Sequence, residues 1–232
     1  MPILKIHLLK FFTPDTRLLI LVPLEIDPRK LKNIIKQFSP TLIILVDGGT
    51  NHLVHLSKKA KLVPIVSVGD GDSSKKHMPR LDILLPVQKD FSDLAFVISA
   101  ILLKKNNFTA INLMGFINFH QIEQRYDHLL FNIGIVQQLS SKLNFKILMD
   151  QRLLFLPAKA STFDYKGLFS VISLTPNNLK LTGKVQYQLK TKTKLAALSS
   201  LGLSNIGLGK IDIEVQKSVI IYFAGSNFSS CF

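Results

Sequence analysis

The chain has 232 residues, 47% of them hydrophobic, and its 29 Lys and Arg against 15 Asp and Glu give a formal net charge of +14. This length can bury the core of one large domain or of two small ones. Uninterrupted apolar runs, such as Leu18–Leu21 and Ala100–Leu103, fall far short of the ~20 residues that span a bilayer. The one cysteine, Cys231, excludes an internal disulfide framework. We therefore predict a cytoplasmic protein without a membrane segment or signal peptide.

The basic charge has two interpretations. It could mark a nucleic-acid-binding surface, or it could be an ordinary solvated coat of lysines. The lysines are dispersed along the chain, and neither an RNA-binding aromatic motif nor a helix-turn-helix signature accompanies them. We therefore favour the solvated surface and expect no nucleic-acid partner.

The first 150 residues alternate strand-like apolar runs with helical periods. The strand-like runs are Arg17–Val22, Thr41–Val46, Leu62–Val68, Asp82–Pro86, Ala110–Met114 and Phe145–Met149. One helix is predicted after Asp27-Pro28, which supplies an N-cap and an N1 proline. A second follows Asp93, and a third covers about Gln124–Leu143. This alternation predicts an α/β domain over residues 1–150, with a mainly parallel sheet and helices on both of its faces.

After Asp150 the pattern changes to short β-type runs without a helical period. These runs are Gly167–Thr175, Leu179–Leu189, Gly209–Val215 and Val219–Phe223. Turn signals separate them at Pro176–Asn178 and at Gly202–Gly209. The pattern predicts an antiparallel β-sandwich or barrel over residues 151–232 and hence a two-domain chain, α/β followed by all-β.

Carboxylates are gathered into a few turn-like segments of this basic chain. Six of the 15 acidic residues lie in four clusters, with Asp47 in DGGTN, Asp70 and Asp72 in GDGDS, Asp90 and Asp93 in KDFSD, and Asp127 in RYDH. Three clusters follow predicted parallel strands, whose carboxyl ends form the ligand-binding edge of such a sheet. Carboxylates brought close together raise one another's pKa unless a cation neutralises them, and Mg²⁺ is the usual cation for oxygen ligands. The clusters together predict a magnesium-nucleotide site.

Each cluster also has a simpler interpretation. Gly48-Gly49 would let the backbone approach a phosphate or ribose closely, and an extended GDGDS loop would direct both aspartates to one side. An Asp-x-Asp sequence, however, is also common in turns. Asp90 with Asp93 would serve equally well as a helix N-cap and N3 pair. Arg125 and Asp127 could form a surface ion pair.

In their order and spacing these clusters resemble the motifs of thiamine pyrophosphokinases. The family pattern runs roughly D-G-G-A-N, G-D-x-D-S, K-D-x-T-D and G-G-R-x-D-H, and the matching segments are Asp47–Asn51, Gly69–Ser73, Lys89–Asp93 and Arg125–His128. Its C-terminal signatures resemble Ser173–Pro176, Thr182-Gly183 with Tyr187 and Leu189, and Gly202–Asn205. The resemblance covers about residues 17–223 and identifies the chain as a divergent member of this family.

The resemblance implies a homodimeric enzyme that transfers a pyrophosphoryl group from ATP to the hydroxyl of thiamine, giving thiamine diphosphate and AMP. It implies that Asp70 and Asp72 hold Mg²⁺, and that Asp93 completes the metal site or accepts the hydroxyl proton. Arg125 would stabilise phosphate charge as a fourth catalytic residue. The implied ATP and phosphate site comprises Asp47, Gly48, Gly49, Asn51, Lys89, Asp90, Ser92 and Asp127. The implied thiamine site, near a dimer interface, comprises Tyr187, Ser204 and Asn205.

The chain departs from the family pattern at several positions. It has Val22-Pro23 where the family has Asn-Gly, Glu123-Gln124 in place of two glycines, and Ile206 in place of an acidic residue. Thr50 and Ser92 are conservative changes. Two alternatives therefore stay open: a related diphosphokinase acting on another acceptor, such as a hydroxymethylpterin, and a catalytically impaired relative that binds thiamine or a nucleotide.

Overall fold

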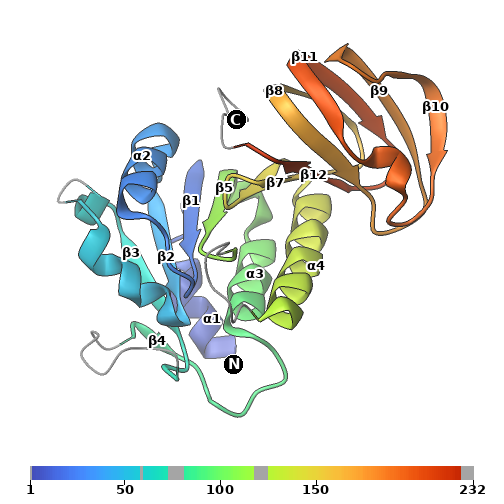
Figure 1. The fold of residues 1–232 in the computed structure, drawn as a ribbon. Helices are drawn as coiled ribbons and strands as arrows, with labels where there is room; N and C mark the ends of the chain where they lie inside the picture. The colour runs from blue at the N-terminus through green and yellow to red at the C-terminus, as the bar shows by residue number, and fades with distance from the viewer. Residues whose placement is uncertain (1, 58–59, 73–80, 118–124, 226–232) are drawn as a thin grey trace. The chain divides into compact units, whose positions relative to one another are not determined.

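The computed structural model describes residues 2–57, 60–72, 81–117 and 125–225 (Figure 1). The chain divides into two compact units, Met1–Ile135 and Val136–Phe232. This division falls inside a helix, ahead of the domain boundary that the sequence pattern predicts at Asp150, and that boundary stays a prediction. No helix in the described part of the chain is long and apolar enough to cross a membrane.

The first unit contains a parallel sheet. Its strands are β1 (Thr16–Leu21), β2 (Leu42–Val46), β3 (Ile65–Gly69), β4 (Ile83–Leu84) and β5 (Phe108–Met114). They lie in the order β5-β1-β2-β3-β4, and every neighbouring pair is parallel. All five residues of β2 are buried, as its unbroken run of Leu, Ile and Val predicts. The predicted α/β pattern is thus confirmed in this unit, and the carboxyl ends of its strands share one edge.

Four α-helices and four short 3₁₀ helices complete the described chain. They are α1 (Pro2–Leu9), α2 (Pro28–Phe38), η1 (Asp47–His55), η2 (Ala60–Leu62), α3 (Asp93–Leu103), η3 (Lys105–Asn107), α4 (Tyr126–Leu143) and η4 (Ser200–Gly202). The start of α2 is as predicted, because Asp27 accepts a hydrogen bond from the N–H of Lys30 and Pro28 follows it. The start of α3 differs from the simpler interpretation given above. Its N-cap is Ser92, whose Oγ accepts from the Ala95 N–H at 3.2 Å, so an Asp90 cap with Asp93 at N3 is wrong.

The second unit contains an antiparallel sheet. Its strands are β6 (Ile147–Met149), β7 (Leu153–Leu156), β8 (Ala160–Ile172), β9 (Asn177–Val185), β10 (Leu189–Leu195), β11 (Asn205–Val215) and β12 (Val219–Phe223). They pair in the continuous order β10-β9-β11-β8-β12-β7-β6. Buried and exposed residues alternate along β11, and its inward side chains join one hydrophobic core. The predicted change to antiparallel β structure is therefore present.

Two details of this sheet were not predicted correctly. The run Leu179–Leu189 is not one strand, because it is divided between β9 and β10. The segment Gly202–Gly209 is not a turn throughout, because β11 already begins at Asn205.

A Cβ on Gly207 would lie 2.6 Å from the carbonyl oxygen of Tyr165, so this glycine permits close approach of β11 to β8.

Candidate active site

Three carboxylates of the first unit meet at the carboxyl edge of its parallel sheet. Asp47 follows β2 directly, Asp70 follows β3, and Asp93 is the first residue of α3. One oxygen from each lies within 4.8 Å of the other two, close enough to share a metal ion. The convergence predicted from the strand order is thus present. The set of carboxylates differs from the predicted metal ligands, because among the described residues the group contains Asp47 and not Asp72.

Two glycines and a threonine fix the position of Asp47. A Cβ on Gly69 would lie 2.8 Å from Cα of Asp47, and one on Gly49 would lie 2.2 Å from the carbonyl oxygen of Leu21. Asp47 itself has a φ of 49°, and its carbonyl oxygen accepts a hydrogen bond from the hydroxyl of Thr50 at 3.2 Å. Gly49 therefore permits close packing of η1 against β1. From the local sequence alone, this role could not be distinguished from close approach of the backbone to a phosphate.

Lys89 lies among the carboxylates as their counter-ion. Its Nζ is paired with the Asp70 carboxylate and lies 3.1 Å from Oδ1 of Asp93. The side chains of Lys89, Asp70 and Asp93 are only 7%, 9% and 11% exposed, so water screens these charges weakly. One ammonium group therefore compensates part of the charge of three carboxylates.

The pKa values of the group follow from this arrangement. Burial by itself would raise the pKa of Asp70, but hydrogen bonds from Lys89 and from the Asp72 N–H lower it overall. Burial would lower the pKa of Lys89, yet its bonds to Asp70 and Asp93 raise it. The pKa of Asp93 is raised, chiefly by burial and also by the charges of Asp70 and Asp47, against the opposing effect of Lys89. Asp93 thus holds a proton more readily than an ordinary aspartate.

Three buried oxygen atoms of this group and of helix η1 have no hydrogen-bond partner among the described residues. They are Oδ1 of Asp47, a residue only 9% exposed, Oδ1 of Asn51 in the same helix η1, and Oδ1 of Asp93, which the Lys89 ammonium approaches to 3.1 Å as an ion pair. Buried acceptors in folded proteins are nearly always satisfied, so such atoms indicate a missing donor or cation. An all-oxygen set with an unpaired carboxylate oxygen fits a hard cation such as Mg²⁺.

The remaining residues of the two middle motifs have local partners or face solvent. The N–H of Asp72 donates to Oδ1 of Asp70 at 3.2 Å, which forms the turn that the simpler interpretation of Asp-x-Asp predicts. Asp72 and Asp90 are exposed, and Ser92 caps α3. Ser73 lies outside the described residues. The metal-binding role of Asp72 and the phosphate-binding roles of Asp90 and Ser92 stay predictions.

Arg125 and Asp127 form an exposed, two-bonded ion pair. Nε of Arg125 donates to Oδ1 of Asp127 at 3.0 Å and Nη2 donates to Oδ2 at 2.5 Å. Their side chains are 67% and 62% exposed, and the hydrogen bonds from Arg125 lower the pKa of Asp127 to about 2. This is the surface ion pair foreseen as the simpler interpretation. Their phosphate-binding roles stay predictions, and the departures at positions 123 and 124 lie outside the described residues.

The residues predicted to bind thiamine belong to the second unit. Nδ2 of Asn205 donates to the carbonyl oxygen of Tyr187 at 2.6 Å, and its Oδ1 accepts from the N–H groups of Tyr187 and Ile206. The Asn205 side chain therefore holds the β9–β10 turn against β11. Tyr187 is 60% exposed, and Ser204 is exposed with a φ of 59°. The amide of Asn205 already has protein partners, so its contact with a ligand stays a prediction.

Sequence reasoning overlooked His52, a buried residue directly after the DGGTN motif. It is 3% exposed, and its Nε2 donates to the carbonyl oxygen of Val22 at 3.0 Å. Burial lowers its pKa, so the neutral form is favoured. This bond ties η1 to the Val22-Pro23 segment, where the chain departs from the family pattern. The motif offered a signal, because His52 follows it immediately, but burial could not be read from spacing.

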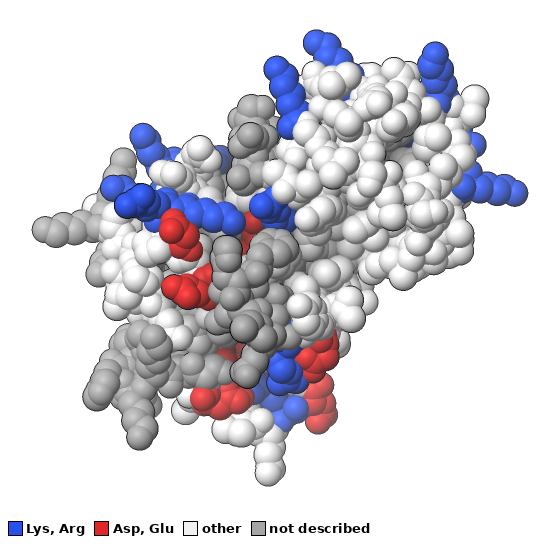
Figure 2. Space-filling model, viewed as in Figure 1, with Lys and Arg blue, Asp and Glu red and all other residues white. Residues whose placement is uncertain are grey.

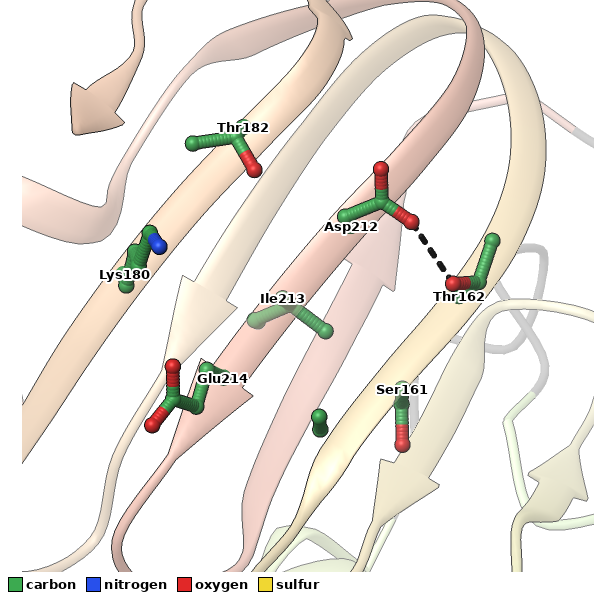
Figure 3. A pocket seen from close by; sticks show the side chains of 8 residues that line it. Ser161, Thr162, Lys180, Thr182, Asp212, Ile213 and Glu214 are labelled. Atoms are coloured by element: carbon green, nitrogen blue, oxygen red, sulfur yellow. Dashed lines mark hydrogen bonds between the residues drawn. The ribbon is translucent and has the colours of Figure 1, made fainter.

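A hollow on the second unit does not resemble this site. It has a volume of about 260 Å³ and is lined by side chains of β8, β9 and β11 (Figure 3). Its carboxylates already have partners: Asp212 accepts from the Thr162 hydroxyl at 2.6 Å, and Glu214 pairs with Lys192 at 2.9 Å. Figure 2 shows Lys and Arg side chains in separate places, mainly toward the edges of the visible surface, and the absence of a nucleic-acid partner stays a prediction.

Comparison with known proteins supports the family suggested by the motifs. The family model described as "Thiamin pyrophosphokinase, catalytic domain" matches residues 33–149, which include Asp47, Asp70 and Asp93. No match was found among curated proteins.

Solved structures of thiamine pyrophosphokinases share the fold. The Bacillus subtilis enzyme is 22% identical, with a TM-score of 0.66 over 90% of this chain and 99% of its own. The Candida albicans enzyme is 14% identical, with a TM-score of 0.67 over 94% of this chain and 90% of its own. The family model spans half of the sequence and contains the three convergent carboxylates. The chain therefore belongs to the thiamin pyrophosphokinase family.

Proposed function

We propose that this protein is a thiamine pyrophosphokinase that uses Mg²⁺ to transfer the pyrophosphoryl group of ATP to the hydroxyl of thiamine, releasing AMP. The observation that carries the proposal is the convergence of Asp47, Asp70 and Asp93 inside the segment that the family model matches. Transfer of this kind depends mainly on positioning and on neutralising charge, and needs no covalent nucleophile from the protein. A part-buried group of carboxylates at the carboxyl edge of the sheet is suited to that task.

Each carboxylate has a proposed role in this chemistry. Asp47, Asp70 and Asp93 would hold Mg²⁺, which, when bound, would neutralise phosphate charge. As an alternative to a place in the metal site, Asp93 would accept the proton of the thiamine hydroxyl as a general base. The Arg125 guanidinium would leave Asp127 and bind a phosphate group instead. A carboxylate and a phosphate each offer a guanidinium two acceptor oxygens.

We further propose a homodimer in which the second unit carries the thiamine site. Several large apolar side chains of this unit are exposed, namely Leu168, Leu174, Tyr187, Leu198, Leu201, Leu203, Ile206 and Leu208. Leu168 and Ile206 lie opposite each other on β8 and β11. Exposed apolar patches mark interaction surfaces, and a twofold axis would pair this surface with itself. Tyr187 and Ser204 are also exposed, and they lie in sequence among these exposed apolar residues. This supports a thiamine site near that interface.

The direct test is product analysis. Incubation of the protein with thiamine, ATP and Mg²⁺ should give thiamine diphosphate and AMP in equal amounts, and chelation of Mg²⁺ should abolish the reaction. Formation of ADP and thiamine monophosphate would contradict pyrophosphoryl transfer. A parallel incubation with a hydroxymethylpterin tests the related diphosphokinase. Absence of product with every acceptor, together with thermal stabilisation by thiamine or a nucleotide, would favour a binding protein.

A further inference from the structure

Lys89 occupies an unusual position in the carboxylate group. Its ammonium contacts two of the three carboxylates that would bind a metal ion, Asp70 and Asp93, and its side chain is only 7% exposed. Elsewhere in the described chain, the pair Lys192–Glu214 is largely open to solvent, with Lys192 67% exposed. The Lys89 contacts are therefore part-buried interactions within the carboxylate group.

A divalent cation and this ammonium would compete for the same carboxylates. Mg²⁺ binds carboxylate oxygens at about 2.1 Å and demands nearly ideal geometry around itself. Lys89 Nζ already lies 3.1 Å from Oδ1 of Asp93 and is paired with Asp70. Two like charges confined to one buried, weakly screened group repel each other strongly. The cation and the Lys89 ammonium therefore cannot both take up their best positions.

We propose that Lys89 is an exchangeable internal counter-ion that couples binding of the metal to binding of the nucleotide phosphates. In the absence of metal its ammonium holds Asp70 and Asp93 together. When a divalent cation binds these carboxylates, the ammonium is released from them and pairs with a phosphate oxygen of the nucleotide. The cation alone then binds weakly, because Lys89 is displaced without a new partner, whereas the metal-nucleotide complex supplies that partner. This inference rests on the metal site of the proposed function.

The geometry favours such an exchange. Lys89 precedes α3 by four residues and reaches Asp93 across the segment that leads into that helix. A lysine ammonium is a compact charge on a flexible stem and binds phosphate without a fixed orientation. Oδ1 of Asp47 has no hydrogen-bond donor among the described residues, and Lys89 does not satisfy it. This oxygen is therefore available to another cation or donor. Lys89 is thus a positioning residue for the carboxylates and a candidate phosphate ligand.

The test uses Lys89→Met, which keeps the length of the side chain and removes its charge. Binding of Mn²⁺ is measured without nucleotide, and binding of α,β-methylene-ATP is measured at saturating Mn²⁺. We expect Mn²⁺ to bind roughly tenfold more tightly to the variant, and the nucleotide analogue to bind roughly tenfold more weakly. A lysine with a merely structural role would weaken both. Lys192→Met, which removes an exposed lysine from the second unit, is the matched control and should change neither.

Two further variants keep the outcomes distinguishable. If Lys89→Met does not fold by circular dichroism, Lys89→Gln replaces it, and Lys89→Arg should behave like the parent because it keeps the charge. Unchanged or weaker binding of Mn²⁺ to a folded, neutral variant overturns the exchange while leaving the metal site intact. If the parent and Asp70→Asn bind Mn²⁺ equally, the metal site itself is wrong, and the exchange falls with it.

Discussion

Buried polar groups are satisfied to different degrees in the two units. In the first unit, carboxylate and amide oxygens of η1 lack donors among the described residues, and a single lysine contacts two of the three converging carboxylates. In the second unit, Asn205 makes three hydrogen bonds to backbone groups, and the carboxylates of the surface hollow are paired. Ser161 Oγ is an exception there. A shortage of partners, more than the number of polar residues, therefore distinguishes a ligand site from a structural network.

The strongest way to break this comparison is to remove one carboxylate from each unit. Asp70→Asn should reduce formation of thiamine diphosphate at least about 10²-fold and remove the Mg²⁺-dependent part of nucleotide binding, because a preorganised charge is lost. Asp212→Asn, in the hollow of the second unit, should leave both unchanged. Product formation and nucleotide titrations with and without Mg²⁺ measure the effect. Equal effects of the two substitutions would contradict the contrast between the units.

The structural role assigned to Asn205 predicts a loss of stability. Asn205→Ala removes three hydrogen bonds, two of which hold the β9–β10 turn, and should lower the free energy of unfolding by about 1–3 kcal/mol. Urea denaturation measures this change. A variant that unfolds like the parent but binds thiamine more weakly in calorimetry would instead make Asn205 a ligand of the substrate.

A substitution of Ser92 distinguishes a role in capping α3 from a role in binding phosphate. Ser92→Ala removes the side-chain acceptor at the start of α3 and should cost about 1 kcal/mol of stability. Mn²⁺ affinity should change little, because the Ser92 side chain is used by Ala95. Ser92→Asp keeps an acceptor and should retain stability. Unchanged stability of Ser92→Ala, together with a loss of nucleotide binding, would favour a phosphate-binding serine.

The smallest expected effect is a pH dependence that originates in the first unit. Burial lowers the folded-state pKa of His52 from its ordinary value of 6.5. Between the two pKa values the unfolded chain binds the extra proton, so stability falls as pH drops below about 6.5, by at most about 1.4 kcal/mol per pH unit. His52→Gln should flatten this part of the profile, measured by urea denaturation between pH 7 and pH 5. An unchanged slope would show that another group causes the acid sensitivity.

The sequence by itself determined the five strands of the parallel sheet, the three helices α2, α3 and α4, and the edge at which the carboxylates meet. Continuous apolar runs such as Leu42–Val46 identified buried parallel strands, and the carboxylates that follow these strands predicted the edge where Asp47, Asp70 and Asp93 meet. These signals are local, because the side-chain period and the residue after a strand are both visible along the chain. The motif order also indicated the family that the family model supports.

Only the tertiary structure decided which side chains meet. Spacing favoured Asp70 with Asp72, yet Asp47 completes the group, because Gly69 and Gly49 bring η1 against the ends of β3 and β1. Likewise, Lys89 could be assigned to a phosphate by its motif, but its pairing with Asp70 and Asp93 depends on how α3 packs beside β3. Distances between segments far apart in sequence are set by packing of the strand ends, and a linear pattern does not contain them.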